Sequence, residues 1–253
     1  MGYLSSFRRF LEPVAFSFAW VLTGSTALAE VDPANPPINL VAFEFGALSH
    51  SENGTAAGPA IEIVAQLVAA TQIRDRNINL VPLVRIRQML TDGHTIAAFI
   101  GRTPEREGQM RWVVNLFNDQ LVFVTYHQTA VNSLAEARRL GSVGATREGY
   151  PLQFLQSAGF KNVEIESAEN ITAKMLINGR IDAWLTASLL IKGEVESHGI
   201  PVDALTIGAP ITDLSFWVAA SLDVPDRTIA EMANRFAAIK ADGSYDRIMK
   251  VSN

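Results

Sequence analysis

The stretch GRTPEREGQMRW places three arginines, Arg102, Arg106 and Arg111, directly after the apolar run TIAAFI. Such a run is typical of a buried strand, so the arginines gather where that strand ends. Thr103 is suited to cap the start of a helix and Pro104 to occupy its first position, which favours a rigid turn. A guanidinium presented by that turn can bind a carboxylate through two parallel hydrogen bonds.

Arg106 has two interpretations of equal weight from this spacing. In the first it binds the negative charge of a ligand. In the second it pairs on the surface with a nearby carboxylate, from Glu105, Glu107 or Asp119. The first interpretation requires a guanidinium that faces a cleft, and the second requires one that is turned outward.

Other candidate residues lie at the ends of expected strands. Ligands of open α/β sheets bind beyond the carboxyl ends of the strands, which places Glu44, Phe45 and Gly101 near any site. Arg85 and Arg147 also follow strands, and would line a cleft with positive charge unless they are scattered solvated side chains. The candidate ligand-binding residues are Arg106, Arg85, Arg147, Tyr150, Phe45, Glu44, Gly101 and Trp184.

The aromatic candidates have a stacking role and a structural alternative. Phe45 or Trp184 would supply a wall on which a ligand stacks. Trp184 and Trp217, however, each alternate with apolar residues along expected strands. Core packing is therefore the preferred interpretation for both tryptophans.

The composition excludes several classes of function. The 253 residues are 48% hydrophobic and carry a formal charge of −5, so a nucleic-acid partner is not expected. Cysteine is absent, and the four histidines are widely spaced, so we expect no metal and no cofactor. Recognisable hydrolase, protease and nucleotide-binding motifs are also absent. An enzyme would need an acid–base pair facing a cleft, for example Glu44 opposite Asp213.

The N-terminus has the order of a secretory signal. A short positive segment, MGYLSSFRR, precedes the apolar stretch VAFSFAWVLTGST, and the small residues ALA stand before Glu30. The apolar stretch is shorter than the ~20 residues that a membrane-spanning helix needs, which disfavours an anchor. We therefore expect residues 1–29 to be a cleaved signal peptide and the mature protein to be exported to the periplasm.

Strand and helix patterns alternate along the rest of the chain, which favours parallel sheets covered by helices on both faces. Expected strands are 38–45, 78–83, 95–101, 120–128, 142–146, 163–167, 182–186, 204–208 and 213–221, and expected helices are 58–71, 85–93, 133–141, 149–159, 169–180, 188–199 and 225–243. Two such sets, with a β run between them and another returning, predict an α/β fold of two lobes joined by two crossings. Lobe 1 is expected to comprise residues 30–122 and 216–253, and lobe 2 residues 123–215.

Four segments in this order resemble type II periplasmic solute-binding proteins, in particular the family that serves polar amino-acid ABC importers. RTPEREGQMRWVVNLF resembles the family's Thr-Pro-Glu-Arg segment, and LAEARRLGSVGATREGY its entry into the second lobe. MLINGRIDAWLT is similar to its Leu-x-x-Gly-Arg-x-Asp-Ala segment, and FAAIKADGSYDRIMK to its C-terminal pattern. The resemblance runs from about Ile38 to Lys250.

The resemblance implies a two-lobed clamp, each lobe a mostly parallel sheet flanked by helices, that closes on a small solute by hinge bending. It implies that Arg106 binds the ligand's α-carboxylate. The acidic residue that holds the α-ammonium in amino-acid binders should fall near Ala187, where the sequence has no acid, and Leu83 stands where a subgroup has an aromatic. An organic acid or another anionic solute is therefore at least as plausible as an α-amino acid.

The expected function is capture of a small anionic solute for a membrane importer permease, by a monomer without enzymatic activity. A second hypothesis is a periplasmic accessory or sensory protein, in which a modified or degenerate cleft acts through a protein partner. The apolar residues Phe99 and Ala187 suit that hypothesis. An enzyme is the third.

Overall fold

The computed structural model describes residues 37–147, 149–196 and 198–250, which fall within one compact unit, residues 36–253. The expected signal peptide, residues 1–29, lies outside the described residues. Within the described part, no helix combines the length and apolar character needed to cross a membrane.

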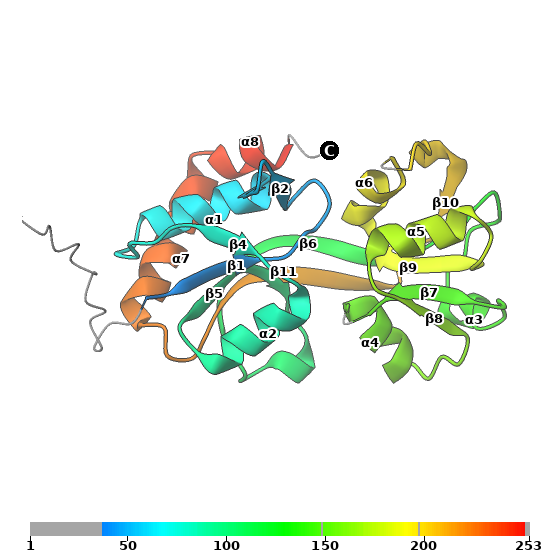
Figure 1. Cartoon of the computed structure of the whole chain (residues 1–253), viewed down its shortest axis with the longest axis horizontal. Coiled ribbons are helices and arrows are strands. Elements are labelled where there is room, and N and C mark those ends of the chain that lie inside the picture. The colour runs from blue at the N-terminus through cyan, green and yellow to red at the C-terminus, as the bar shows by residue number, and fades with distance from the viewer. Residues whose placement is uncertain (1–36, 148, 197, 251–253) are drawn as a thin grey trace, which may run out of the picture. The chain divides into compact units, whose positions relative to one another are not determined.

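The described residues contain one large mixed sheet (Figure 1). Its strands are β1 (Asn39–Ala42), β4 (Ile78–Leu80), β5 (Thr95–Gly101), β6 (Arg111–Tyr126), β7 (Val143–Thr146), β8 (Val163–Glu166), β9 (Ala183–Ala187), β10 (Leu205–Ile207) and β11 (Thr212–Ala220). Their order is β4-β1-β5-β11-β6-β9-β7-β8, with β10 paired to β6. The outer pairs β4-β1, β1-β5, β9-β7 and β7-β8 are parallel, as the alternating sequence pattern predicts.

The centre of the sheet is antiparallel and is formed by the long strands β6 and β11. β6 begins at Arg111, nine residues before the expected β run, because its first half pairs with β11 from Ala220↔Arg111 to Thr212↔Leu121. The last part of β6 pairs instead with β9 and β10. The expected lobe boundaries, after residues 122 and 215, fall inside these two strands and remain predictions.

Helices cover both faces of each parallel group. They are α1 (Pro59–Ala69), α2 (Leu83–Asp92), α3 (Leu134–Ala137), α4 (Tyr150–Ser157), α5 (Glu169–Ile177), α6 (Ile191–Glu196), α7 (Asp226–Ala241) and α8 (Ser244–Lys250), with 3-10 turns η1 (Pro104–Arg106), η2 (Ser188–Leu190) and η3 (Val202–Ala204). Figure 1 shows α1, α7 and α8 on one side of β1 and β5, with α2 on the other. The helices α5 and α4 lie on opposite sides of the strands β7 and β9. The predicted two-lobed α/β fold is confirmed.

One hairpin was missed by the periodicity analysis. Strands β2 (His50–Glu52) and β3 (Thr55–Ala57) pair antiparallel across Asn53 and Gly54, which have φ values of 51° and 78°. Asn-Gly is the strongest short-range signal for a two-residue turn that needs positive φ at both positions. The dipeptide was therefore present in the sequence, but the short polar strands around it carry no hydrophobic alternation.

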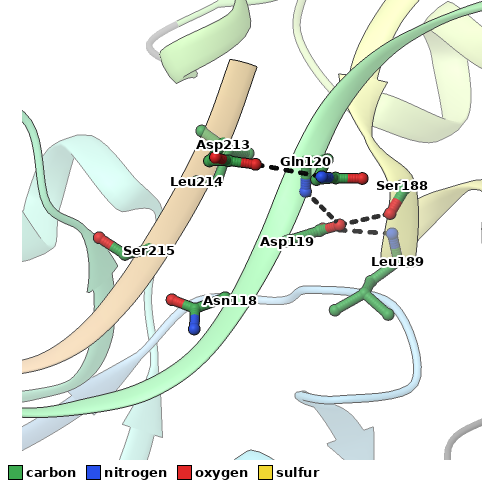
Figure 2. Close-up of a pocket in the computed structure, with 8 residues that line it drawn as sticks. All are labelled: Asn118, Asp119, Gln120, Ser188, Leu189, Asp213, Leu214 and Ser215. Carbon is green, nitrogen blue, oxygen red and sulfur yellow. Dashed lines mark hydrogen bonds between the residues drawn. The ribbon is translucent and has the colours of Figure 1, made fainter. Parts of the chain in front are cut away.

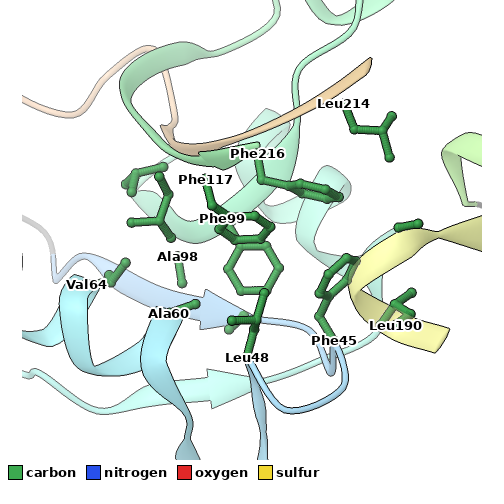
Figure 3. Close-up of a cluster of buried hydrophobic side chains, with 14 of the residues drawn as sticks. Phe45, Leu48, Ala60, Val64, Ala98, Phe99, Phe117, Leu190, Leu214 and Phe216 are labelled. Atoms are coloured by element: carbon green, nitrogen blue, oxygen red, sulfur yellow. The ribbon is translucent and has the colours of Figure 1, made fainter. Parts of the chain in front are cut away.

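A cluster of phenylalanine rings fills the core beside β5 and β11 (Figure 3). Phe99 is fully buried, and its ring centroid lies 4.8 Å from Phe43, 5.8 Å from Phe45 and 5.5 Å from Phe117. Phe117 and Phe216 stack at 4.7 Å. These spacings are the favoured range for aromatic pairs. Phe99, which the accessory hypothesis placed in the cleft, is instead packed within this ring cluster.

We predict that Phe99→Ala lowers the free energy of unfolding by about 3–5 kcal/mol, because it removes a buried ring and leaves a cavity that its neighbours cannot fill. Leu222→Ala is the control, since Leu222 is 62% exposed and its truncation should change stability by less than about 0.5 kcal/mol. Urea unfolding measures both. An equally small decrease in the free energy of unfolding in the two variants would contradict the central role of this ring cluster.

Candidate ligand-binding cleft

A cavity of about 990 Å³, here called the cleft, is lined by elements from both ends of the sheet. One group of lining residues follows β1, begins α2 and follows β5. The other follows β7, begins α4 and α5, and follows β9. The cleft thus collects the carboxyl ends of parallel strands and the first turns of helices, the usual place for ligands in open α/β sheets. Its volume suits a small molecule.

Arg106 ends the η1 turn and lines the cleft while being only 5% exposed. Its Nη1 donates to the carbonyl oxygen of Gly101 at 2.6 Å. Its Nη2 is buried and has no hydrogen-bond partner among the described residues. Burial, followed by the nearby charge of Arg87, lowers the pKa of Arg106 to about 10. A buried donor without a partner is costly, and a charge-assisted hydrogen bond to an anion in the cleft would offset that cost.

The surface-pairing interpretation of Arg106 is not supported for two of its three candidate carboxylates. Glu107 pairs instead with Arg102, whose Nε lies 2.7 Å from its Oε1. The Asp119 carboxylate accepts hydrogen bonds from the backbone N–H groups of Gln120, at 2.7 Å, and Leu189, at 3.2 Å. Both carboxylates are thus engaged elsewhere. The charge of Glu105, the third candidate, does act on Arg106, although burial has the larger effect on its pKa.

Six of the eight candidate residues line the cleft, namely Arg106, Arg147, Tyr150, Phe45, Glu44 and Gly101. Tyr150 begins α4 beside Arg106, and burial raises the pKa of its hydroxyl. Arg147 is exposed and follows β7. These residues are far apart in the sequence and are gathered only by the meeting of strand ends.

Two candidates do not line the cleft, and both expectations are corrected. Arg85 is exposed on α2, because Ile86 and Leu90 occupy the face of that helix that packs on the sheet. Trp184 is 0% exposed in the middle of β9, so it cannot stack on a ligand. Its preferred alternative, core packing, is confirmed.

Glu169, which the sequence analysis missed, lines the cleft as the first residue of α5. Its Oε2 accepts hydrogen bonds from Trp184 Nε1 at 2.9 Å and from Thr186 Oγ1 at 3.3 Å. Burial raises the pKa of Glu169 to about 7, although these hydrogen bonds favour the charged form. Trp184 and Thr186 share one face of β9 because side chains alternate along a strand. Only the packing of α5 on that face brings Glu169 to them.

Two further carboxylates belong to the same cleft. Glu194 of α6 and Glu44, which follows β1, both line it. Burial raises the pKa of Glu194; His198 acts in the opposite direction, and Glu44 adds to the increase. Position 187 has no acid, as the sequence shows, yet the cleft around it contains three.

The polar residues before β3 were also missed. Ser49, His50 and Ser51 line the cleft from the start of the β2–β3 hairpin. Ser49 is 0% exposed, and its Oγ has no hydrogen-bond partner within the described part of the chain. It is thus a second buried polar group whose hydrogen-bonding capacity is unfilled.

Apolar side chains supply the rest of the cleft wall. Phe43, Phe45 and Phe216 come from the ring cluster, and Leu83 and Val84 from the start of α2. Phe45 is therefore placed where a stacking wall was expected. Such a surface favours the hydrocarbon part of a solute, while the charged groups fix its orientation.

A second, more open pocket of about 640 Å³ lies where β6 and β11 pass between the two groups of helices (Figure 2). Figure 2 shows the Asp119 carboxylate bonded to Ser188 and to the backbone of Leu189, and Gln120 bonded to Asp213 at 3.1 Å. These contacts tie β6 to η2 and to β11. Asp213 thus lies in this pocket rather than opposite Glu44 in the cleft, so the acid–base pair that an enzyme would need is not assembled from them. No group of three or more His, Asp or Glu side chains in residues 37–147, 149–196 and 198–250 is placed to hold a metal ion.

Two α/β lobes on a shared pair of strands, with a cleft at the strand ends, define the fold of type II periplasmic solute-binding proteins. A histidine kinase sensor domain with similarity to periplasmic binding proteins aligns with a TM-score of 0.75 at 15% identity, covering 84% of this chain and 94% of that one. The amino-acid ABC transporter substrate-binding protein AbpA of Streptococcus pneumoniae, bound to L-arginine, aligns at 0.69 and 15% identity, covering 85% and 93%. The ancestral amino-acid-binding protein AncCDT-1, a precursor of cyclohexadienyl dehydratase, aligns at 0.69 and 16% identity, covering 84% and 93%.

These likenesses establish the fold. No protein-family model matches the sequence, and no curated protein matches it. The resemblance drawn from the four sequence segments is confirmed at the level of the fold.

We predict that Arg106→Met stabilises the ligand-free protein by about 1–2 kcal/mol, because it removes a buried charge with an unfilled donor. Arg85→Met is the matched control and should change stability by less than about 0.5 kcal/mol, since Arg85 is exposed. The midpoint of urea unfolding measures the difference. A clearly less stable Arg106→Met protein would show that the guanidinium serves the fold rather than a ligand.

We predict a stability effect of Glu169 that depends on pH. Its folded pKa, about 7, lies above the ordinary value of 4.5, so the unfolded chain ionises first and stability falls as pH rises from 4.5 to 7. Glu169→Gln has no carboxyl group to ionise. Its free energy of unfolding should therefore rise relative to that of the native protein across that window, by on the order of 3 kcal/mol at pH 8. Denaturant unfolding at pH 4.5, 6 and 8 measures the gain. Glu164→Gln, an exposed change on β8, should show no such trend.

Proposed function

We propose that this protein is a non-enzymatic solute-binding protein of the Gram-negative periplasm, which captures a small carboxylate-bearing solute and delivers it to an ABC-type membrane importer. The observation that carries the proposal is Arg106, a buried guanidinium in the cleft wall whose Nη2 has no hydrogen-bond partner among the described residues. Residues 1–29 act as a cleaved export signal. Residues 30–122 with 216–253, and residues 123–215, form the two lobes of a monomeric clamp that closes on the solute.

The chemistry of the cleft supports carboxylate capture. A carboxylate that reaches Arg106 receives charge-assisted hydrogen bonds in a site from which water is largely removed, where such bonds are strongest. The Tyr150 hydroxyl and the exposed Arg147 lie on the same cleft and supply further donors. AbpA, which has this fold, is described as an amino-acid transporter component bound to L-arginine, a carboxylate-bearing solute.

A second function, an accessory or sensory role through a protein partner, is favoured by a different observation. One structure with this fold, at a TM-score of 0.75, is a histidine kinase sensor domain. In that role the clamp reports its occupancy to a receptor, or contacts a partner without binding a solute.

The test is thermal unfolding of residues 30–253 with a panel of amino acids and organic acids, for the native protein and for Arg106→Ala. A ligand at a hundred times its dissociation constant should stabilise the native protein by ~2.7 kcal/mol, which is a clear shift in Tm. The shift should be lost in Arg106→Ala and kept in Arg85→Ala, whose side chain does not line the cleft.

Two results would contradict the proposal. A shift that persists in Arg106→Ala would place the anion elsewhere. No shift with any member of the panel would favour the accessory or sensory role.

A further inference from the structure

The turn that carries Arg106 is fastened to the strand β11 through Arg102. We infer that Arg102, Glu107 and Trp217, here called the clasp, position the Arg106 guanidinium for the carboxylate of the solute. This inference rests on the proposed function and concerns how the same cleft is prepared for its solute. The members of the clasp are positioning residues, because they act through Arg106.

A bidentate ion pair joins two residues that flank the turn. Arg102 Nε donates to Glu107 Oε1 at 2.7 Å, and Nη2 donates to Oε2 at 3.2 Å. The η1 turn, Pro104–Arg106, lies between these residues, so the pair closes the loop that presents Arg106. The bond from Arg102 also holds the pKa of Glu107 below its ordinary value. An isolated surface pair contributes little to stability, but two parallel hydrogen bonds fix both side chains in one geometry.

The Arg102 guanidinium also lies over two indole rings. Its Cζ is 4.6 Å from the ring centroid of Trp217 and 5.3 Å from that of Trp112. Both distances are within the ~6 Å at which a cation is attracted to an aromatic face. The backbone N–H of Arg102 donates to the carbonyl oxygen of Ser215 at 2.9 Å, and Trp217 Nε1 donates to Oγ of the same serine at 3.1 Å. The side chain and the backbone of Arg102 are therefore both attached to β11.

An irregularity of β11 lies at Trp217. The pairing with β6 shifts register between Phe216 and Trp217, and the pairing with β5 shifts between Trp217 and Ala219. Such bulges re-aim side chains and are over-represented beside functional sites. Phe216 lines the cleft, whereas Trp217 is half-buried and stacks on Arg102. Core packing, the interpretation that the sequence favoured for Trp217, is therefore corrected.

The position of Arg106 depends on the loop that the clasp closes. Its Nη1 donates to the carbonyl oxygen of Gly101 at 2.6 Å, and its backbone N–H donates to that of Thr103 at 3.0 Å. These two acceptors stand directly before and directly after Arg102 in the chain. A guanidinium that is fixed before the anion arrives loses less freedom on binding, which favours the complex. Loosening the clasp should therefore weaken the recognition of an anion.

The test compares pentanoate with pentanamide, its uncharged isostere, by isothermal titration of residues 30–253. The ratio of the two affinities measures the effect of the negative charge, and we expect the native protein to prefer pentanoate. Arg102 itself lines the cleft, so the test changes its two partners, which do not. Glu107→Ala and Trp217→Leu should each lower the preference for pentanoate by about threefold or more. Glu164→Ala, an exposed change on β8, should leave it unchanged.

A double substitution separates a positioning role from a merely structural one. In Arg106→Ala the guanidinium that the clasp positions is absent, so the further change Glu107→Ala should not alter the affinity ratio. Hydrogen exchange gives a second readout that needs no ligand. The amides of Arg106, Glu107 and Gln109, which donate within the turn, should exchange faster in Glu107→Ala, while the amides of β5 keep their native rates.

The outcomes separate this inference from the proposed function. A preference for pentanoate that is lost in Arg106→Ala but unchanged in Glu107→Ala and Trp217→Leu would overturn the inference and leave carboxylate capture intact. An equal effect of Glu107→Ala with and without the Arg106 side chain would also overturn it, because the clasp would then act on the fold as a whole. Equal binding of pentanoate and pentanamide by the native protein, or no binding of either, would contradict the proposed function and the inference together.

Discussion

The pairing of β6 with β11 is the constraint on which the rest of the structure depends. β11 pairs with β6 along its whole length and also with β5, while the end of β6 pairs with β9 and β10. Each parallel group of strands is therefore attached to the same antiparallel pair. Because backbone hydrogen bonds fix the register of that pair, they also fix where the strand ends of both groups meet. The cleft is formed there.

The cleft combines groups that would be unfavourable in an ordinary core. Arg106 is buried, its Nη2 has no hydrogen-bond partner in the described part of the chain, and its pKa is lowered to about 10, while Glu169 has a pKa raised to about 7. Both departures have burial as their largest cause. A fold selected for stability alone would replace such groups with apolar side chains. Their presence in one cavity, beside an apolar wall that includes Phe45 and Phe216, is the pattern of a site that a bound solute completes.

The two charged side chains differ in how they are held. Arg106 is held by a local contact, since its Nη1 bonds to Gly101 only five residues earlier. Glu169 is held by Trp184 and Thr186 on a strand that packs against α5. The first can be recognised from a short run of sequence. The second exists only when β9 and α5 are in place, which is why the sequence suggested core packing or ligand stacking for Trp184 but not a hydrogen bond to Glu169.

The sequence by itself determined the α/β class, most of the strands and helices, and Arg106. Hydrophobic periodicity and turn residues act locally, and the run TIAAFI followed by Thr-Pro-Glu-Arg gives both a buried strand and the position of the guanidinium at its end. Tertiary structure decided the rest. The full length of β6, the exposure of Arg85 and the approach of Glu169, Glu194 and Glu44 to one cavity depend on pairing and packing between segments distant in the chain. A single sequence carries no local signal for such contacts, because the partner that satisfies each residue is supplied only by the fold.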